Sequence, residues 1–173
     1  MIAYRDAVPA DGPALDAMAR QSWIDTFQKS CSAEDMELYL AQAYGSDGAL
    51  IRDLSDPAMH FHVAVEGAQA DGRIIGYAKL VPTYLTDMSP ATRQLGQLYV
   101  AADRLGVGVA PVLMDWAIAT ARADGGDALV LTVWEGNARA QRFYARYGFV
   151  HVGDYAFQTG TQTDRDLILR LAL

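Results

Sequence analysis

The spacing of apolar residues predicts that the first third of the chain is mainly helical. Residues 1–7 alternate apolar and polar side chains and predict a short strand. Apolar residues then recur at helical spacing over 15–23, behind Asp11, whose residue type commonly caps a helix. A second helix is predicted over 32–43. A third, shorter helix ends before Pro57, because the residue preceding a proline is disfavoured in helical geometry.

The rest of the chain alternates strands with two further helices. Period-two alternation or short apolar runs predict strands over 61–66, 74–81, 94–100, 128–133, 151–157 and 165–173. Helices are predicted over 109–120 and 138–147. The turn-rich connection GAQADGR makes the first two of these strands a hairpin, whereas a helix between two strands permits a parallel crossover. The fold class is therefore α/β or α+β, with a mixed sheet flanked by helices.

Composition limits the compartment and the partners. The length predicts a single domain over residues 1–173, since a chain of this size buries one sizeable core. A net charge of -7 makes nucleic acid and anionic membranes unsuitable partners. No apolar run is long enough to span a bilayer, and the first residues carry no secretory signal pattern. With Cys31 as the single cysteine, we expect a cytoplasmic protein without disulfides.

The segment LYVAADRLGVGVAPVLM, residues 98–114, places bare backbone between a predicted strand and a predicted helix. Gly106 and Gly108 would let an anion approach the main chain closely. The amide groups of about residues 105–110 lie at the positive end of the helix dipole. These features predict a phosphate or pyrophosphate site, with Arg104 as a nearby counter-charge.

Other interpretations of this loop are weaker. A simple strand-to-helix turn would need glycine only for its backbone angles, and this segment alone does not exclude that. A P-loop requires Gly-Lys-Ser/Thr, which is absent. A dinucleotide fingerprint requires a small residue where Pro111 stands. A second segment, LTVWEGNARAQRFYARYGF, residues 131–149, changes this balance only through the resemblance given below. It begins as a strand, turns at Gly136 and runs as a helix, with Asn137 as the cap and Gly148 as the stop.

Together these two segments resemble the GCN5-related N-acetyltransferase (GNAT) superfamily. Residues 137–149 match its pattern N-x-x-A-x-x-F-Y-x-x-x-G-F at every defined position. Residues 105–110 match its loop pattern Gln/Arg-x-x-Gly-x-Gly/Ala except at Leu105, where the family has Gln or Arg. The resemblance implies a mixed, mostly antiparallel sheet of six to seven strands, splayed between the fourth and fifth strands.

The resemblance also implies acetyl-CoA as the acetyl donor. Its pyrophosphate would lie on the loop amides, and its pantetheine arm would lie along the exposed edge of the strand before the loop. The absence of Gln or Arg at position 105 concerns the affinity for the cofactor rather than its identity, and Arg104 is a candidate replacement. The cofactor-binding residues implied in this way are Leu98, Tyr99, Val100, Leu105, Gly106, Val107, Gly108, Val109, Ala110, Asn137 and Phe143.

The implied reaction is direct attack of a primary amine on the thioester. An alkylamine has a pKa of about 10.4, so a carboxylate or a water chain must first remove its proton. Tyr144 matches the tyrosine to which the family assigns proton donation to the departing thiolate. The other interpretation is a tyrosine that packs its ring. Glu135 and Asp25 are candidate bases, although carboxylates are most often solvated surface groups.

Aromatic residues are candidates for the wall of an acceptor pocket. Trp23 and Phe27 are four residues apart on a predicted helix, and Trp134 and Glu135 adjoin the second motif. Core packing is the commoner explanation for aromatic residues at this spacing.

Two other kinds of site are not predicted. His60 and His62 share one face of a strand, but no third ligand follows at a suitable spacing, so no metal is expected. Cys31 has no partner-histidine signature, and the superfamily transfers the acetyl group directly, so a cysteine nucleophile is rejected.

The acceptor is less specified than the cofactor. Segments such as SWIDTF, GYAKL and TDRDLIL are similar, in order, to bacterial polyamine (spermidine-type) N-acetyltransferases, which implies a small-molecule amine such as a polyamine. A protein N-terminus or lysine is the alternative acceptor. A CoA-binding sensor without turnover and a structural interaction module are rival functions, and retention of Tyr144 and Asn137 weighs against the sensor. The family likeness also suggests a homodimer.

Overall fold

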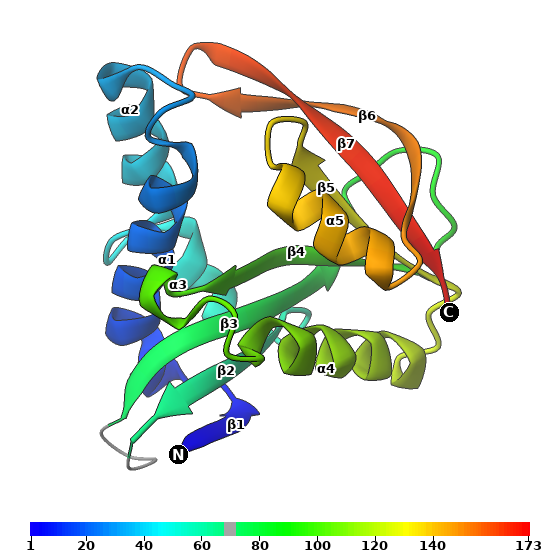
Figure 1. The fold of residues 1–173 in the computed structure, drawn as a ribbon, viewed down its shortest axis with the longest axis horizontal. Helices are drawn as coiled ribbons and strands as arrows, with labels where there is room; N and C mark the ends of the chain where they lie inside the picture. The colour runs from blue at the N-terminus through cyan, green and yellow to red at the C-terminus, as the bar shows by residue number, and fades with distance from the viewer. Residues whose placement is uncertain (68–71) are drawn as a thin grey trace.

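The computed structural model describes residues 1–67 and 72–173. Seven strands form one sheet in the order β1-β2-β3-β4-β5-β7-β6 (Figure 1). All neighbouring strands are antiparallel except β4 and β5, which are parallel. The predicted fold class, a mixed and mostly antiparallel sheet flanked by helices, is confirmed. In the predicted hairpin connection GAQADGR, residues 68–71 lie outside the described residues.

The strands are β1 (Ile2–Asp6), β2 (His60–Glu66), β3 (Arg73–Pro82), β4 (Thr92–Val100), β5 (Ala128–Trp134), β6 (Val150–Thr159) and β7 (Gln162–Ala172). The helices are α1 (Gly12–Phe27), α2 (Ala33–Ala43), α3 (Ala49–Leu54), α4 (Val109–Ala123) and α5 (Ala138–Arg146). Two short 3-10 turns are η1 (Pro9–Asp11) and η2 (Ala102–Arg104). The elements follow the predicted order, with boundaries shifted by a few residues at most helix ends.

Two layers of helices cover the two faces of the sheet. Helices α1, α2 and α3 lie on one face, and α4 and α5 lie on the other (Figure 1). The core on the α1 side is built around Leu15, Trp23 and Tyr77, whereas the core on the α4 side is built around Leu113 and Leu131. Buried strands with apolar residues on both faces allow this arrangement, because each face needs a covering layer.

The strands β4 and β5 separate after a short paired stretch. Their register covers only residues 92–94 against residues 128–130. Directly beyond it, the β3–β4 register shifts between Lys79 and Leu80, so that Gly96 is the extra residue of a β-bulge. A bulge bends its strand and increases the local twist, and β5 stays paired with β7 along its whole length. The predicted splay between the fourth and fifth strands is therefore confirmed.

Capping side chains explain where two of the helices, α2 and α5, begin. The Ser32 side chain accepts a hydrogen bond from the Asp35 amide at 3.0 Å, and Asn137 accepts one from the Ala140 amide at 3.1 Å. Asp11 stands at the predicted N-cap position of α1, but its side chain makes no capping hydrogen bond. Its carboxylate accepts two hydrogen bonds from the Arg5 guanidinium, both at 2.7 Å, and one from the Val8 amide, so it is directed back toward β1 and η1.

Candidate active site

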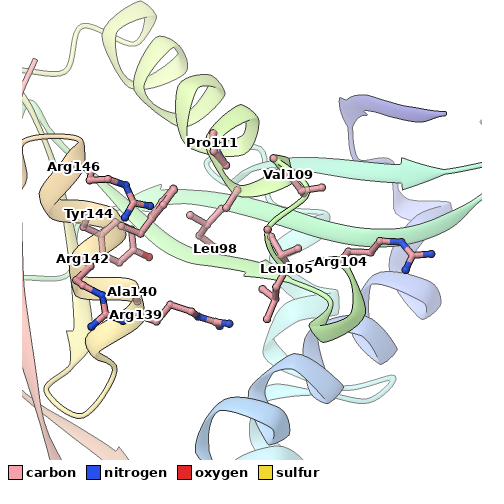
Figure 2. Close-up of a pocket in the computed structure, with 15 residues that line it drawn as sticks. Leu98, Arg104, Leu105, Val109, Pro111, Arg139, Ala140, Arg142, Tyr144 and Arg146 are labelled. Carbon is pink, nitrogen blue, oxygen red and sulfur yellow. The ribbon is translucent and has the colours of Figure 1, made fainter.

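A cleft of about 370 Å³ lies between the N-terminus of α4, the end of β4 and one face of α5 (Figure 2). We call this cleft the outer cleft. Most of the residues that the sequence assigned to the cofactor line it, and they come from two motifs that are far apart in the chain. These predicted residues are Leu98, Val100, Leu105, Gly106, Gly108, Val109, Ala110 and Phe143.

The loop before α4 presents main-chain donors to the outer cleft. Gly106 and Gly108 have φ angles of 81° and 90°, in the left-handed region that favours glycine. The amide groups of Gly106, Val107 and Gly108 donate no backbone hydrogen bond within the described part of the chain. Turns of this kind expose successive N–H groups at a helix N-terminus, where the helix dipole adds positive potential. The loop can therefore hold an anion.

Close packing against the sheet fixes the position of this helix N-terminus. Val109 lines the outer cleft but is only 1% exposed, and its side chain packs in the core. A Cβ atom on Gly76 of β3 would lie 2.9 Å from Val109 Cγ1, so only glycine allows α4 to approach so closely. Val109 therefore offers the cleft its amide group, while Val107, at 56% exposed, points to solvent.

Three of the four arginines that line the outer cleft come from α5, and the fourth is Arg104. Arg139, Arg142 and Arg146 line the cleft from one side, and Figure 2 shows Arg139 pointing toward the loop. The predicted counter-charge, Arg104, is directed away from the cleft centre, where it donates hydrogen bonds to the Glu66 carboxylate at 2.7–3.1 Å and to Asp103. The sequence analysis missed the α5 arginines, although their spacing of three and four residues indicates one helical face.

A smaller cavity of about 100 Å³ occupies the opening between β4 and β5. We call it the inner cleft. Phe27, Gln97, Tyr99 and Trp134 line it from the α1 side of the sheet. The two clefts share Leu98, Ala140 and Tyr144. The opening between the strands therefore connects the two faces of the sheet at these shared residues.

Tyr144 lies where the two clefts meet. The residue is 8% exposed, its ring packs edge-on against Phe143 and Phe149, and its hydroxyl group points into the cleft (Figure 2). Burial raises the pKa of Tyr144 above its usual value of about 10, so the hydroxyl stays protonated at neutral pH. A protonated phenol in this position can donate to a leaving group.

Asn137 performs at least one of its two predicted roles. Its side chain caps α5, and the residue also lines the inner cleft next to Trp134.

Tyr99 lies on the opposite face of β4 from Leu98 and Val100, with its ring 6.0 Å from the ring of Tyr77. Its side chain therefore belongs to the α1 side of the opening.

The residues predicted for the acceptor pocket lie in different surroundings. Phe27 and Trp134 line the inner cleft, with their ring centroids 5.9 Å apart. Trp23, at 2% exposed, lies in the core. Glu135 lies outside the clefts and pairs with Arg165 at 2.9 Å on the surface.

The candidate base Asp25 stands at the rim of the site. It lines a third hollow, of about 370 Å³, together with Asn137 and Trp134. Its carboxylate accepts a hydrogen bond from Gln21 at 2.8 Å.

Asp166 of β7 is a carboxylate that the sequence analysis did not single out. It is 7% exposed, and burial raises its pKa to about 6, against a smaller lowering by the Thr132 side chain.

The histidines and the cysteine line neither the outer nor the inner cleft. His62 Nδ1 lies 2.7 Å from an Asp6 carboxylate oxygen, and its ring stacks on Trp116. His60 lies 3.5 Å from Asp124, and burial raises the pKa of the Cys31 thiol. Within residues 1–67 and 72–173, no three His, Cys, Asp or Glu side chains are grouped to hold a metal ion. Over the same residues, no helix has the length and apolar character required to cross a membrane.

Comparisons with known sequences identify relatives with a shared description. The sequence profile of the Acetyltransferase (GNAT) family matches residues 17–149. An uncharacterized N-acetyltransferase of Lactobacillus delbrueckii subsp. lactis is 28% identical over 165 residues, which cover 94% of this chain and 92% of that protein. An uncharacterized N-acetyltransferase of Mycobacterium tuberculosis is 38% identical over 120 residues, which cover 67% of this chain and 69% of that protein.

Solved structures share the fold over the whole chain. The PaiA N-acetyltransferase of Thermoplasma acidophilum, in complex with coenzyme A, superposes with a TM-score of 0.78 at 21% identity, covering 100% of this chain and 99% of that one. The yncA protein of Salmonella typhimurium, with its cofactor acetyl-CoA, gives a TM-score of 0.74 at 19% identity, covering 100% and 94%. Because the family profile spans most of the chain and the sequence relatives agree with it, this chain belongs to the acetyltransferase (GNAT) family.

Proposed function

We propose that this acetyltransferase uses acetyl-CoA to acetylate a primary amine of a small molecule by direct transfer. The observation that carries the proposal is the opening between β4 and β5, which joins a main-chain anion site to a separate cavity on the opposite face of the sheet. Two substrates that approach from opposite faces can meet there without a covalent enzyme intermediate.

The outer cleft fits acetyl-CoA at two points. A diphosphate requires N–H donors and positive charge, which the loop amides and the α5 arginines supply. The pantetheine arm is a chain of amides, and the edge of β4 from Leu95 to Val100 has no strand partner on its β5 side in the described residues. An unpaired strand edge binds extended amide chains through main-chain hydrogen bonds. When bound, acetyl-CoA supplies the acetyl group as a thioester.

Tyr144 supplies the proton that the leaving sulfur requires. Its hydroxyl lies between the two clefts, and burial keeps it protonated at neutral pH. A thiolate with a pKa of about 8.5 is a good leaving group, and a positioned acid accelerates its departure further. The hydroxyl of Tyr144 therefore acts as the general acid in this proposal.

The acceptor reaches the thioester through the inner cleft. Its small volume, of about 100 Å³, fits the end of an amine chain rather than a bulky group. The similarity to polyamine acetyltransferases and the net charge of -7 both support a cationic amine such as a polyamine. We also propose a cytoplasmic location, where acetyl-CoA and such amines coexist. A homodimer is a separate prediction, which size-exclusion chromatography tests.

The function is tested by ligand stabilisation and by release of free CoA. Acetyl-CoA at 100-fold excess over its Kd should raise the unfolding free energy by about 2.7 kcal/mol. A panel of polyamines, amino acids, aminoglycosides and peptides with free N-termini should then release CoA with a small amine. Binding without turnover would indicate a sensor, release with peptides alone would indicate a protein acetyltransferase, and no stabilisation would leave only an interaction module.

A further inference from the structure

The carboxylate of Asp166 lies between two aromatic residues on the α1 side of the sheet. The strand registers put Asp166 directly opposite Trp134 of β5 and Tyr155 of β6. Residues that face each other on neighbouring antiparallel strands point to the same face, with their Cβ atoms about 5 Å apart. None of the ion pairs within the described residues includes Asp166.

Further aromatic rings enclose the same region. Tyr84 packs on Tyr155 and Tyr39 packs on Phe157, both with ring centroids 5.7 Å apart. Phe157 is two residues from Tyr155 on β6 and therefore shares its face. The flat faces of such rings carry negative potential and attract cations. We call these five residues the aromatic cluster: Tyr39, Tyr84, Trp134, Tyr155 and Phe157.

The electrostatics of this region favour the binding of a positively charged group. Burial raises the pKa of Asp166 to about 6, so the carboxylate is still mainly ionised at pH 7. Burial also raises the pKa of Tyr39 to about 12, and the charges of Tyr84 and Asp166 add to the shift. A buried carboxylate without a cation is unfavourable, because desolvation is not offset by a charge partner.

We propose that Asp166 and the aromatic cluster bind a second, non-reacting ammonium group of the acceptor and select aliphatic amines that carry a net positive charge besides the amine that is acetylated. This inference rests on the proposed function and adds the residue that determines the specificity for the acceptor. An alkylammonium can pair with the carboxylate and lie against the rings, and both interactions strengthen where water is partly excluded. Thr132 and Trp134 line the inner cleft beside Asp166, so a bound chain extends from the carboxylate toward Tyr144.

The test compares Asp166→Asn with a matched control, Asp154→Asn. Asp154 lies on β6 opposite Leu167, one position from the register of Asp166 and therefore on the other face of the sheet. With putrescine as acceptor, Asp166→Asn should raise KM by about 10- to 100-fold, the loss expected for one charge-assisted hydrogen bond. The values of kcat and of the Kd for acetyl-CoA should change by less than about threefold, and Asp154→Asn should leave all three unchanged.

The pH profile and a conservative variant separate binding from a structural effect. In the wild type, KM for putrescine should rise as the pH falls through about 6, because Asp166 takes up a proton. Asp166→Asn should lack this dependence, and Asp166→Glu should restore part of it. Zwitterionic alanine should be a poor acceptor for the wild type and should gain relative to putrescine in Asp166→Asn.

Other titratable groups face this carboxylate from the surrounding elements. Burial raises the pKa of Tyr39, Tyr84 and Tyr99, so these groups do not account for a change near pH 6. The neighbouring carboxylate on β7 is held by hydrogen bonds from Gln162 and Thr159. These facing groups are Tyr39, Tyr84, Tyr99, Tyr155 and Asp164.

An unchanged KM in Asp166→Asn, or an equal rise in Asp154→Asn, would overturn the inference while leaving acetyl transfer intact. If the wild type releases no CoA with any amine, the proposed function fails instead. Calorimetric titration of putrescine into the enzyme without acetyl-CoA then decides the inference separately. Binding to the wild type that is lost in Asp166→Asn supports it, and equal or absent binding in both proteins contradicts it.

Discussion

The outer and inner clefts adjoin each other but are built in different ways. The outer cleft takes its donors from the main chain of one continuous loop, Leu105 to Ala110, and its charge from one helix face. The inner cleft, the aromatic cluster and Asp166 take side chains from α1, α2, α5, β4, β5, β6 and β7. A site made of contiguous backbone depends on few side chains, whereas a site assembled from distant elements changes with each of them.

This difference gives the two clefts different tasks. Every residue except proline carries a main-chain N–H donor, so the outer cleft suits a ligand part that is constant, such as the diphosphate of acetyl-CoA. The side chains around Asp166 can differ without disturbing the loop, so the inner cleft suits the variable partner. We therefore expect mutations in the two clefts to affect separate kinetic parameters.

The largest effect should come from the residue shared by both clefts. Tyr144→Phe removes the proton donor and should lower kcat by about 100-fold or more, with little change in the Kd for acetyl-CoA. The control is Tyr147→Phe at the C-cap of α5. Tyr147 lines neither cleft, and its hydroxyl hydrogen-bonds to the Pro111 carbonyl and the Asp115 carboxylate. Steady-state kinetics and calorimetry measure the two parameters. Wild-type turnover of Tyr144→Phe at every pH would remove the general acid.

The backbone character of the outer cleft is tested by glycine substitutions. Gly108→Val should weaken acetyl-CoA binding by about tenfold or more, because the side chain would cover amides that make charge-assisted hydrogen bonds. Gly125→Val is the matched control, since Gly125 also has a positive φ and open space around it but follows α4. Both variants should lose about 1–2 kcal/mol of stability from left-handed strain. Equal affinities in the two variants would mean that the loop is only a turn.

The buried carboxylate of Asp166, which lies opposite Trp134 of the inner cleft, should affect the pH dependence of stability. Because the folded-state pKa of Asp166 is raised to about 6, the folded protein binds more protons than the unfolded chain between about pH 4 and 6. Its unfolding free energy therefore falls as the pH rises through this window. Asp166→Asn should lack this fall and should be more stable than the wild type at pH 7 by about 1–3 kcal/mol.

Urea unfolding at pH 4.5 and pH 7 measures this difference, and Asp154→Asn should show the opposite sign. Hydrogen bonds from Arg165 lower the pKa of Asp154, so its contribution is present at neutral pH and is lost on acidification. A stability difference between Asp166→Asn and the wild type that does not depend on pH would show that burial does not perturb this carboxylate.

The smallest effects should come from the arginines around the outer cleft. Arg139→Gln should weaken acetyl-CoA binding by about threefold and reduce its salt dependence, since an exposed charge contributes little in water. Arg104→Gln should have a smaller effect on affinity, because its guanidinium is engaged by Glu66 and Asp103. Calorimetry at two salt concentrations measures both. A larger loss in Arg104→Gln would restore the original assignment of Arg104 as the counter-charge.

The same difference explains what could be predicted from the sequence. The loop with Gly106 and Gly108 and the helix with Asn137 and Tyr144 are local patterns, and the structure builds both as strand, turn and helix. Local periodicity likewise gave the order of the strands and helices along the chain. It did not show that Asp11 turns back to Arg5, because that choice depends on a side chain from another element.

The acceptor side could not be predicted in this way. In the sequence, Asp166 is an ordinary polar position in an alternating strand. Only the strand order β5–β7–β6 places it between Trp134 and Tyr155. Trp23 has the spacing expected for a pocket wall or for a core, and its stacking on Tyr39 within the core depends on how α1 and α2 pack. Long-range register decides such positions, and it leaves no signature in a single local segment.

A crystal structure of the enzyme with acetyl-CoA tests the central claim most directly. We expect the diphosphate oxygens within about 3 Å of the amide nitrogens between Gly106 and Ala110, and the thioester beside the Tyr144 hydroxyl. A diphosphate bound elsewhere, with these amides facing solvent, would contradict the account.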